Sequence, residues 1–493
     1  CLPADALDTH HDLWFEVLSE LSECVYLAGD FQEARKLFDH ALAHARTRLN
    51  KAIIYEKIIV ATTHESLDEE ACTVVCTALD MFGLGVRQRP GALSVARSLM
   101  HSKWLLWRRS RQSILNAPDI NDPEMRICLR ILLSVMPPAY QCGDNDLFAL
   151  AALKAVVLSL KHGNTADTGY SFVLYGMMIG GALGQYREGR SFGELGLEIL
   201  KRYNDPDMNG RALGTFGAMV HPWTSAIRTS YPLMRDAYEY DLQAGNIIYA
   251  GYASLLEANA RLQGGIALSE LEAFCTQTLP FWRKSRDKSV QATGLALIET
   301  SRALSDAKHS RPHLIAQDLG DPDEVWRKAF GTARSAMASL RLMVAYLLDD
   351  RETAERAAVD STANVAAAMA SVMEPLHHLW LALFYSQILP ESTGAKRRTV
   401  LKGLRIARKK MTVWSGFCPE NFEHQRQLIE GAWALGRGTP EKALIHLDSA
   451  IQGAREHRFI QHEAVANELA LHASLSLKRR SFATVYLVEA VAA

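Results

Sequence analysis

The sequence predicts an all-α protein, a solenoid in which antiparallel helical hairpins stack one on the next. Two observations support this fold class. A spacing of one turn residue followed by small, large and small side chains recurs from the start of the chain to its end. Runs of alternating β-branched and polar residues bounded by turn dipeptides, which would indicate strands, are nearly absent. With 48% hydrophobic and 22% charged residues, the 493-residue chain has the composition of a globular protein.

The first copy of this spacing lies in "LAGDFQEARKLFDHALAHA", residues 27–45, where Gly29 precedes Ala34, Phe38 and Ala41. Intervals of four and three residues place Ala34, Phe38 and Ala41 on one face of a helix. Gly29 suits the tight turn that ends the preceding helix. Small side chains let two helices approach closely, and Phe38 fills the space between them. The stretch therefore predicts one helical hairpin.

The same spacing recurs because every hairpin meets the same packing problem. The further copies, in chain order, are Ala71, Val75 and Ala78; Gly184, Gly189, Gly193 and Gly196; Asp349, Ala354 and Ala358; Gly438, Ala443, Leu447 and Ala450; and Ala483, Leu487 and Ala490. These are the small-large-small positions of a tetratricopeptide repeat (TPR), whose period of about 34 residues gives roughly 10–12 hairpins for this length.

The breaks between predicted helices are short, as helical hairpins require, so we expect one continuous TPR-like domain over residues 1–493. An internal break near 305–325 is left open. The most apolar run, 171–184, is shorter than the ~20 residues that cross a bilayer and is predicted to be a buried helix, not a membrane span. Because the chain starts at Cys1 and stops within a predicted helix, we expect it to be a piece of a longer polypeptide.

The charges nearly cancel, with 54 Lys and Arg against 55 Asp and Glu. No net field therefore draws the chain onto nucleic acid or an anionic membrane, and any such role would need a local patch. The eight cysteines are scattered and no signal segment is found, which indicates reduced thiols in a cytoplasmic protein.

Motifs that would carry chemistry were not found. The phosphate-binding and protein-kinase signatures are absent, so we expect this chain to be no enzyme and to hold no cofactor. Cys72 and Cys76 share a helix face but lack two further ligands nearby, so packed thiols are favoured over a metal site.

One candidate site is "MVHPWTS", residues 219–225, in which Pro222 is predicted to open a helix, with His221 just before it and Trp223 in its first turn. Histidine and tryptophan at a helix start can line a groove for a ligand or partner. They can equally wedge two hairpins together, and this simpler interpretation is favoured.

The second candidate is a helix within "GAKRRTVLKGLRIARKKMTVW", residues 394–414. Its apolar stripe consists of Val400, Leu404, Ala407 and Met411, and its opposite side carries Arg398, Lys402, Arg405 and Lys409. A solvated outer face is the simpler interpretation. The functional interpretation is a basic face that docks onto an acidic surface of a neighbouring domain or partner.

Six stretches also resemble, in order, the TPR-like helical region of large multidomain signalling proteins. They are residues 26–60, 78–91, 122–140, 156–200, 221–255 and, most closely, 418–475, "CPENFEHQRQLIEGAWALGRGTPEKALIHLDSAIQGAREHRFIQHEAVANELALHASL". Proteins of that kind carry a serine/threonine-kinase-like domain, a STAND-type AAA ATPase, helical repeats, a GAF domain and a histidine kinase. The segment 300–325 does not take part in the resemblance.

The resemblance implies a non-catalytic regulatory and interaction domain of a signal-transduction kinase. It would bind a partner segment or a small effector and modulate neighbouring kinase and ATPase domains of the same polypeptide, and a homodimer through the full-length protein stays open. The alternative is a free-standing TPR scaffold or chaperone-type adaptor that binds peptides. An all-α enzyme built from scattered residues is the least favoured hypothesis.

Overall fold

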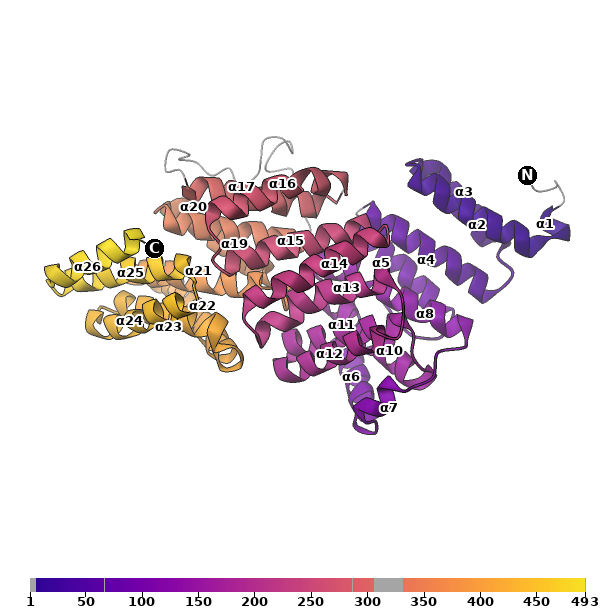
Figure 1. Cartoon of the computed structure of the whole chain (residues 1–493), viewed down its shortest axis with the longest axis horizontal. Coiled ribbons are helices and arrows are strands. Elements are labelled where there is room, and N and C mark those ends of the chain that lie inside the picture. Colours follow the sequence, from indigo (N-terminus) through magenta and orange to yellow (C-terminus); the bar gives the residue numbers. More distant parts are fainter. Residues whose placement is uncertain (1–5, 66, 286, 306–330, 493) are drawn as a thin grey trace. The chain divides into compact units, whose positions relative to one another are not determined.

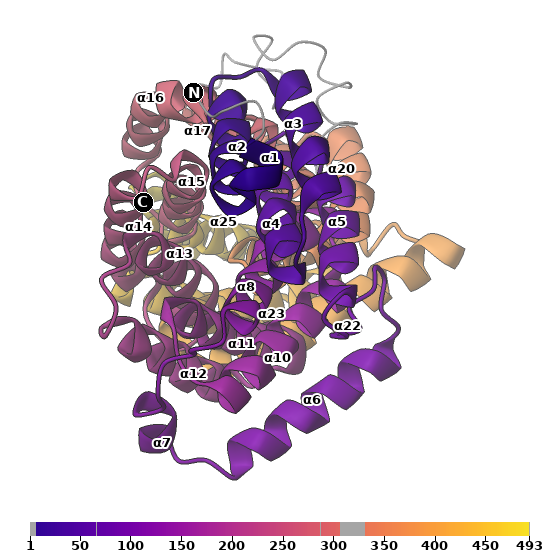
Figure 2. The same cartoon turned by 90° about the vertical axis from the view of Figure 1, so that its right-hand side faces the viewer.

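The computed structural model describes residues 6–65, 67–285, 287–305 and 331–492 (Figures 1 and 2). Within these ranges the chain consists of helices joined by short connections, with one isolated bridge between Asp119 and Asn164. The all-α prediction is confirmed. Residues 306–325, most of the segment in which an internal break was left open, lie outside the described residues.

The internal contacts divide the chain into two compact units, and each is described by itself. Unit 1 comprises residues 1–175 and 194–208, and unit 2 comprises residues 176–193 and 209–493. The boundary falls within three helices: α11 (Ala166–Leu183), α12 (Tyr186–Leu200) and α13 (Pro206–Thr215). A single domain over 1–493 stays a prediction.

Unit 1 is built from stacked helices of the N-terminal part of the chain. They are α1 (Ala6–Thr9), α2 (His11–Leu27), α3 (Phe31–His44), α4 (Arg48–His64), α5 (Asp68–Asp80), α6 (Ala92–Trp107), α7 (Arg111–Leu115), α8 (Pro123–Ser134), α9 (Met136–Cys142) and α10 (Asn145–His162), with parts of α11, α12 and α13. Helices α2 and α3 form one hairpin and α4 and α5 the next. Helices α2, α4, α8 and α10 also pack in succession, which gives the continuous row of a solenoid.

Unit 2 repeats this arrangement over a longer stretch. After α13 come η1 (Phe216–Val220), η2 (His221–Trp223), η3 (Ile227–Ser230), α14 (Tyr231–Gln243), α15 (Ile247–Gln263), α16 (Leu268–Lys284), α17 (Lys288–Ser305), α19 (Gly331–Leu347), α20 (Arg351–Asn364), η5 (Val365–Ala368), α21 (Met373–Ile388), α22 (Gly394–Phe417), α23 (Pro419–Gly436), α24 (Pro440–Glu456), α25 (Ile460–Ser476) and α26 (Arg480–Ala492). Each of α15, α17, α19, α21, α23 and α25 contacts the next member of this series. The unit is an α-solenoid, as predicted.

The turn positions predicted from the spacing adopt the conformation that a hairpin needs. Gly29, Gly184 and Gly438 have φ angles of 93°, 70° and 72°, and Asp349 has a φ of 55°. These values lie in the left-handed region that ends many helices and favours glycine. The small and large positions that follow are buried, including Ala34, Phe38, Ala41, Ala443, Leu447 and Ala450.

Glycines at the small positions of α12 permit an unusually close helix crossing. A Cβ atom at Gly189 would lie 2.5 Å from the carbonyl oxygen of Gly176, and one at Gly196 would lie 2.3 Å from that of Gly169. Atoms at such distances would overlap, so any larger side chain would push α11 and α12 apart. The predicted role of Gly189 and Gly196 as contact positions is confirmed.

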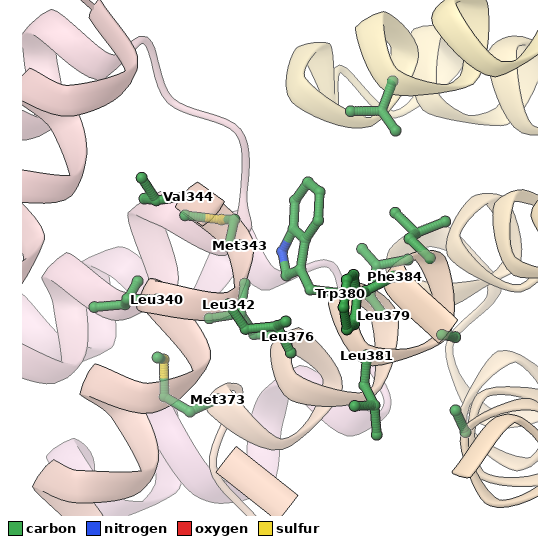
Figure 3. Close-up of a cluster of buried hydrophobic side chains, with 14 of the residues drawn as sticks. Leu340, Leu342, Met343, Val344, Met373, Leu376, Leu379, Trp380, Leu381 and Phe384 are labelled. Carbon is green, nitrogen blue, oxygen red and sulfur yellow. The ribbon is translucent and has the colours of Figure 1, made fainter. Parts of the chain in front are cut away.

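Helix α21 lies in the core of unit 2, and α19 packs against it (Figure 3). Leu376, Leu379 and Trp380 of α21 and Leu342 of α19 belong to one cluster of buried side chains. Trp380 is among the largest fully buried side chains of the described residues. Because α21 is buried around most of its circumference, its sequence shows little amphipathic pattern.

One repeat position departs from the prediction. Leu487, expected to be the large buried residue of the last copy, is 49% exposed, while Ala483 is buried. Helix α26 packs chiefly on α25, and that contact covers Ala483 but leaves Leu487, one turn further along the same face, half exposed. The spacing correctly located the helix but placed Leu487 in the core by mistake.

Candidate functional site

The segment around His221 and Trp223 ends a helical run and does not begin one. Helix α13 passes into the π-helical segment η1 and then into the single 3-10 turn η2, which contains Pro222. The prediction that Pro222 opens a helix is therefore wrong. The chain leaves the helix at Thr224, whose carbonyl and hydroxyl oxygens accept hydrogen bonds from Arg190 of α12, at 3.4 and 3.3 Å. The next long helix, α14, starts seven residues later at Tyr231.

Trp223 is the centre of a buried aromatic cluster in unit 2. Its side chain is 2% exposed and stacks on Tyr186, at 5.0 Å between ring centroids, and on Phe422, at 5.7 Å. The Trp223 Nε1–H donates to the carbonyl oxygens of Met219, at 3.0 Å, and Ala370, at 3.1 Å. A tryptophan that is buried with its only donor satisfied serves packing. This geometry matches the wedge interpretation.

The same cluster also links α12, α22 and α23 through polar groups. Trp414 Nε1 donates a hydrogen bond of 2.8 Å to the hydroxyl of Tyr186, and burial raises the pKa of Tyr186 to about 12. Asn421 of α23 donates to the carbonyl oxygens of Pro222 and Ser225, at 2.7 and 2.8 Å, and accepts from the Ile227 amide at 2.9 Å. Asn421 thus satisfies three backbone groups of a loop that has left its helix. Sequence reasoning did not identify this residue.

His221 is half-buried beside the cluster, and its Nε2 lies 2.7 Å from the hydroxyl oxygen of Thr229. The cavity nearby, lined in part by Ile227, Phe422 and Phe459, measures about 10 Å³. Such a volume holds about one water molecule. The structure therefore places the predicted groove residue Trp223 in a closed, packed region, with the half-buried His221 beside it.

The second candidate, the basic helix, is α22, and its predicted amphipathic pattern is confirmed. Val400, Leu404, Ala407 and Met411 are buried, and α22 packs between α21 and α23. A Cβ atom at Gly403 would lie 2.5 Å from the ring of Tyr385, so this glycine allows close contact with α21.

Some cations of α22 are neutralised by neighbouring helices. Arg408 makes a two-pronged ion pair with Glu430 of α23, at 2.8 and 2.7 Å. Lys396 bonds to Glu355 of α20 at 2.7 Å, and Lys410 pairs with the buried Glu374 of α21. These contacts are internal to the fold.

The four cations predicted to form the docking face differ from these. Arg398, Lys402, Arg405 and Lys409 are all exposed, and within the described part of the chain none forms an ion pair or a side-chain hydrogen bond. Their spacing of four, three and four residues places them on one face, over roughly 16 Å of helix. We name these four residues the basic face of α22. Unpaired like charges on a helix repel each other, and an anionic partner would relieve that repulsion.

Two further features bear on the sequence predictions. Within the described ranges no helix is long and apolar enough to cross a membrane, and no three His, Cys, Asp or Glu side chains are grouped as ligands for a metal ion. Cys72 is buried and Cys76 partly buried, and burial raises the pKa of both thiols, that of Cys76 to about 11.

Comparison with known proteins gives limited similarity. No known family profile matches the chain. A curated protein, "Hybrid signal transduction histidine kinase G" of Dictyostelium discoideum, is 20% identical over 280 residues, which cover 53% of this chain and 8% of that protein. A solved structure, "Circular tandem repeat protein with novel repeat topology and enhanced subunit contact surfaces", aligns with 97% of this chain and 98% of its own at 14% identity, with a TM-score of 0.18. The chain thus spans a small fraction of its curated relative.

Proposed function

We propose that the chain is a regulatory and interaction region of a signal-transduction kinase, and that the basic face of α22 docks onto an acidic surface of a neighbouring domain or partner. The observation that carries this proposal is the contrast within α22. Three of its cations pair inside the fold, while Arg398, Lys402, Arg405 and Lys409 stay exposed and unpaired. The similarity to a hybrid histidine kinase supports the kinase context.

The stacked hairpins explain how docking could change the activity of an adjacent domain. Helix α22 packs on α21 and α23, so a partner that binds its outer side more tightly in one arrangement of those neighbours shifts the balance toward that arrangement. Exposed charges contribute little to intrinsic stability, but they set association rate and specificity. We infer a salt-sensitive contact whose loss alters kinase output and leaves the fold intact.

The size of the native polypeptide tests the kinase context. An immunoblot of source cells, with antibodies raised against this chain, should show a band several times larger than 54.7 kDa. A band near 54.7 kDa would overturn the proposal and favour the free-standing TPR scaffold.

Charge reversal tests the docking face in the full-length kinase. The variant Lys402→Glu/Arg405→Glu should change autophosphorylation severalfold and weaken its dependence on salt. The matched control is Lys442→Glu/Arg479→Glu, which reverses two exposed cations of α24 and the α25–α26 turn. If both variants change activity equally, or if neither does, the basic face is not the docking surface.

A further inference from the structure

Helix α6 of unit 1 carries an apolar stripe that faces away from the rest of that unit. The stripe consists of Leu93, Met100, Trp104 and Trp107, which are 74%, 63%, 51% and 85% exposed. Their spacing of seven, four and three residues places all four on one side of the helix. The opposite side, which includes the buried Ser102, packs on α10. Isolated exposed apolar residues are ordinary, but a contiguous row with two tryptophans marks an interaction surface.

The stretch of sequence that contains this stripe carries charges of one sign. No Asp or Glu occurs between residues 81 and 118, whereas this segment contains Arg87, Arg89, Arg97, Lys103, Arg108, Arg109 and Arg111. Arg97 and Arg108 are exposed beside the stripe, and the Arg108 guanidinium lies 4.9 Å from the centre of the Trp104 ring. The chain as a whole has a net charge of −1, so this is the kind of local patch that anion binding requires.

A depression of about 710 Å³ opens beside the same face of α6. It is lined by Gly91, Leu93, Ser94, Arg97, Ser98, His101 and Lys154. Burial, together with the nearby Lys161, lowers the pKa of Lys154. Two cationic side chains and two hydroxyls around one hollow suit a phosphate group, and an anion placed there would favour the charged form of Lys154.

We propose that α6 docks onto the surface of an anionic lipid bilayer. Leu93, Met100, Trp104 and Trp107 would enter the boundary between headgroups and acyl chains, where tryptophan is favoured. Arg97 and Lys154 would bind lipid phosphates in the adjacent depression. The site holds the protein on the membrane and needs no spanning helix. It is independent of the basic face of α22.

The geometry favours a bilayer over the other occupants of such a face. An acidic protein that takes the apolar face of a basic helix into a groove also contacts both flanks of that helix. One flank of α6 is already occupied, because Lys154 of α10 lines the depression beside it. A second copy of this chain would bring two basic segments together, which costs repulsion at close range. The surface of an anionic bilayer can bind the apolar stripe and the flanking cations at the same time, and it needs access to only one side of the helix.

Co-sedimentation with vesicles tests the proposal on the 493-residue chain. Binding should be strong for phosphatidylcholine vesicles that contain about 30 mol% phosphatidylserine and weak for pure phosphatidylcholine, and it should fall as salt rises. Trp104→Ala/Trp107→Ala should weaken binding about tenfold or more, since it removes the two largest inserted side chains. Arg97→Glu/Arg108→Glu should weaken binding at least about thirtyfold, because each of the two cations adds to the affinity for an anionic surface and both are replaced by anions.

Two control variants show whether the loss of vesicle binding is specific to α6 or follows from removing any exposed apolar or cationic side chains. Val485→Ser/Val488→Ser removes exposed apolar side chains from α26, and Lys442→Glu/Arg479→Glu reverses two exposed charges in α24 and the α25–α26 turn. Both should bind vesicles as the unaltered chain does. All the substituted side chains are exposed, and unchanged circular dichroism melting curves would establish that each variant folds.

Four outcomes would overturn the proposal. They are no preference for anionic vesicles, equal losses in the α6 and control variants, binding of soluble polyglutamate as tight as that of vesicles, and a concentration-dependent dimer that the Trp104→Ala/Trp107→Ala variant abolishes. The third would identify an acidic protein as the occupant of the stripe and the fourth a second copy of this chain. Because α22 is tested in a different assay, its failure and that of α6 are distinguishable.

Discussion

Hairpin turns place single residues in a left-handed conformation, and three of those residues in unit 2 are not glycine. Asp349, Arg458 and Lys478 have φ angles of 55°, 62° and 59°, where Gly438 has 72° at an equivalent turn. A side chain in this conformation brings Cβ close to the following carbonyl oxygen and costs roughly 1–2 kcal/mol. These turns therefore carry strain that the helix contacts on either side offset.

Replacing Lys478 by glycine should relieve that strain. The lysine is exposed, and its side chain makes no hydrogen bond or ion pair in the described part of the chain, so no such interaction is lost. We expect Lys478→Gly to raise the free energy of unfolding by about 0.5–1 kcal/mol, after the greater chain entropy of glycine is subtracted. Lys478→Ala should leave it nearly unchanged, because alanine keeps the Cβ. Urea denaturation measures both, and equal effects would show that the turn is unstrained.

At the scale of elements, the glycine contact between α11 and α12 should tolerate no added methyl group. Alanine favours helix over glycine by about 1 kcal/mol, yet Gly189→Ala would place a Cβ 2.5 Å from the backbone oxygen of Gly176. We expect a net destabilisation of about 1–3 kcal/mol in thermal or chemical unfolding. The control is Gly416→Ala in α22, where nothing lies within 4 Å of the new Cβ and stability should be kept or slightly raised.

The elements were predictable from the sequence because their periodicity is local. The spacing of Ala34, Phe38 and Ala41 and the stripe of α22 need only positions within one helix, and both predictions hold. The hydrogen bond from Asn421 to the Pro222 carbonyl joins residues 199 positions apart, so no local pattern could reveal it.

The α6 surface shows a different limit of sequence reasoning. The absence of acidic residues over 81–118 can be read directly from the sequence. An apolar stripe on a helix usually faces the core, however, and the spacing of Leu93, Met100, Trp104 and Trp107 does not tell which side packs on α10. Only the structure shows that this stripe is the outward one.

Two buried histidines make the contact between α23 and α25 sensitive to acid. His424 Nε2 lies 2.9 Å from His462 Nδ1, and both side chains are fully buried. Burial lowers the pKa of His462 to about 3, and burial with the neighbouring His462 and His457 lowers that of His424 well below its ordinary value. In the unfolded chain both titrate near 6.5, so below that pH the unfolded state binds protons that the folded state does not. Stability must therefore fall as the pH falls.

We expect about 2–3 kcal/mol to be lost through this pair between about pH 7.5 and about pH 5.5. The double variant His424→Gln/His462→Asn keeps polar atoms near the two bonded nitrogens but does not titrate, so its unfolding free energy should decline less over the same interval. His472→Asn, which replaces an exposed histidine of α25, should decline like the unaltered chain. Identical pH profiles for the double variant and the unaltered chain would show that the pair does not control acid sensitivity.

At the scale of the whole molecule, a solenoid distributes its stability locally. Each hairpin contacts chiefly its neighbours, so the free energy of opening is set helix by helix and a defect spreads only as far as those contacts carry it. The chain should therefore not unfold as a single cooperative system.

Hydrogen exchange with mass spectrometry tests this expectation. Trp380→Ala empties a fully buried position of α21 and should cost about 3–5 kcal/mol locally, so that amides of α19, α21 and α23 lose protection while those of α2 and α3 do not. Phe38→Ala in α3 serves as the reciprocal control: it should expose α2, α3 and α4 and leave α21 protected. If either substitution lowers protection equally throughout the described ranges, the chain unfolds as one cooperative unit. In that case the partner contacts proposed for α22 would act on the whole fold, because a change in one hairpin would alter the stability of all the others.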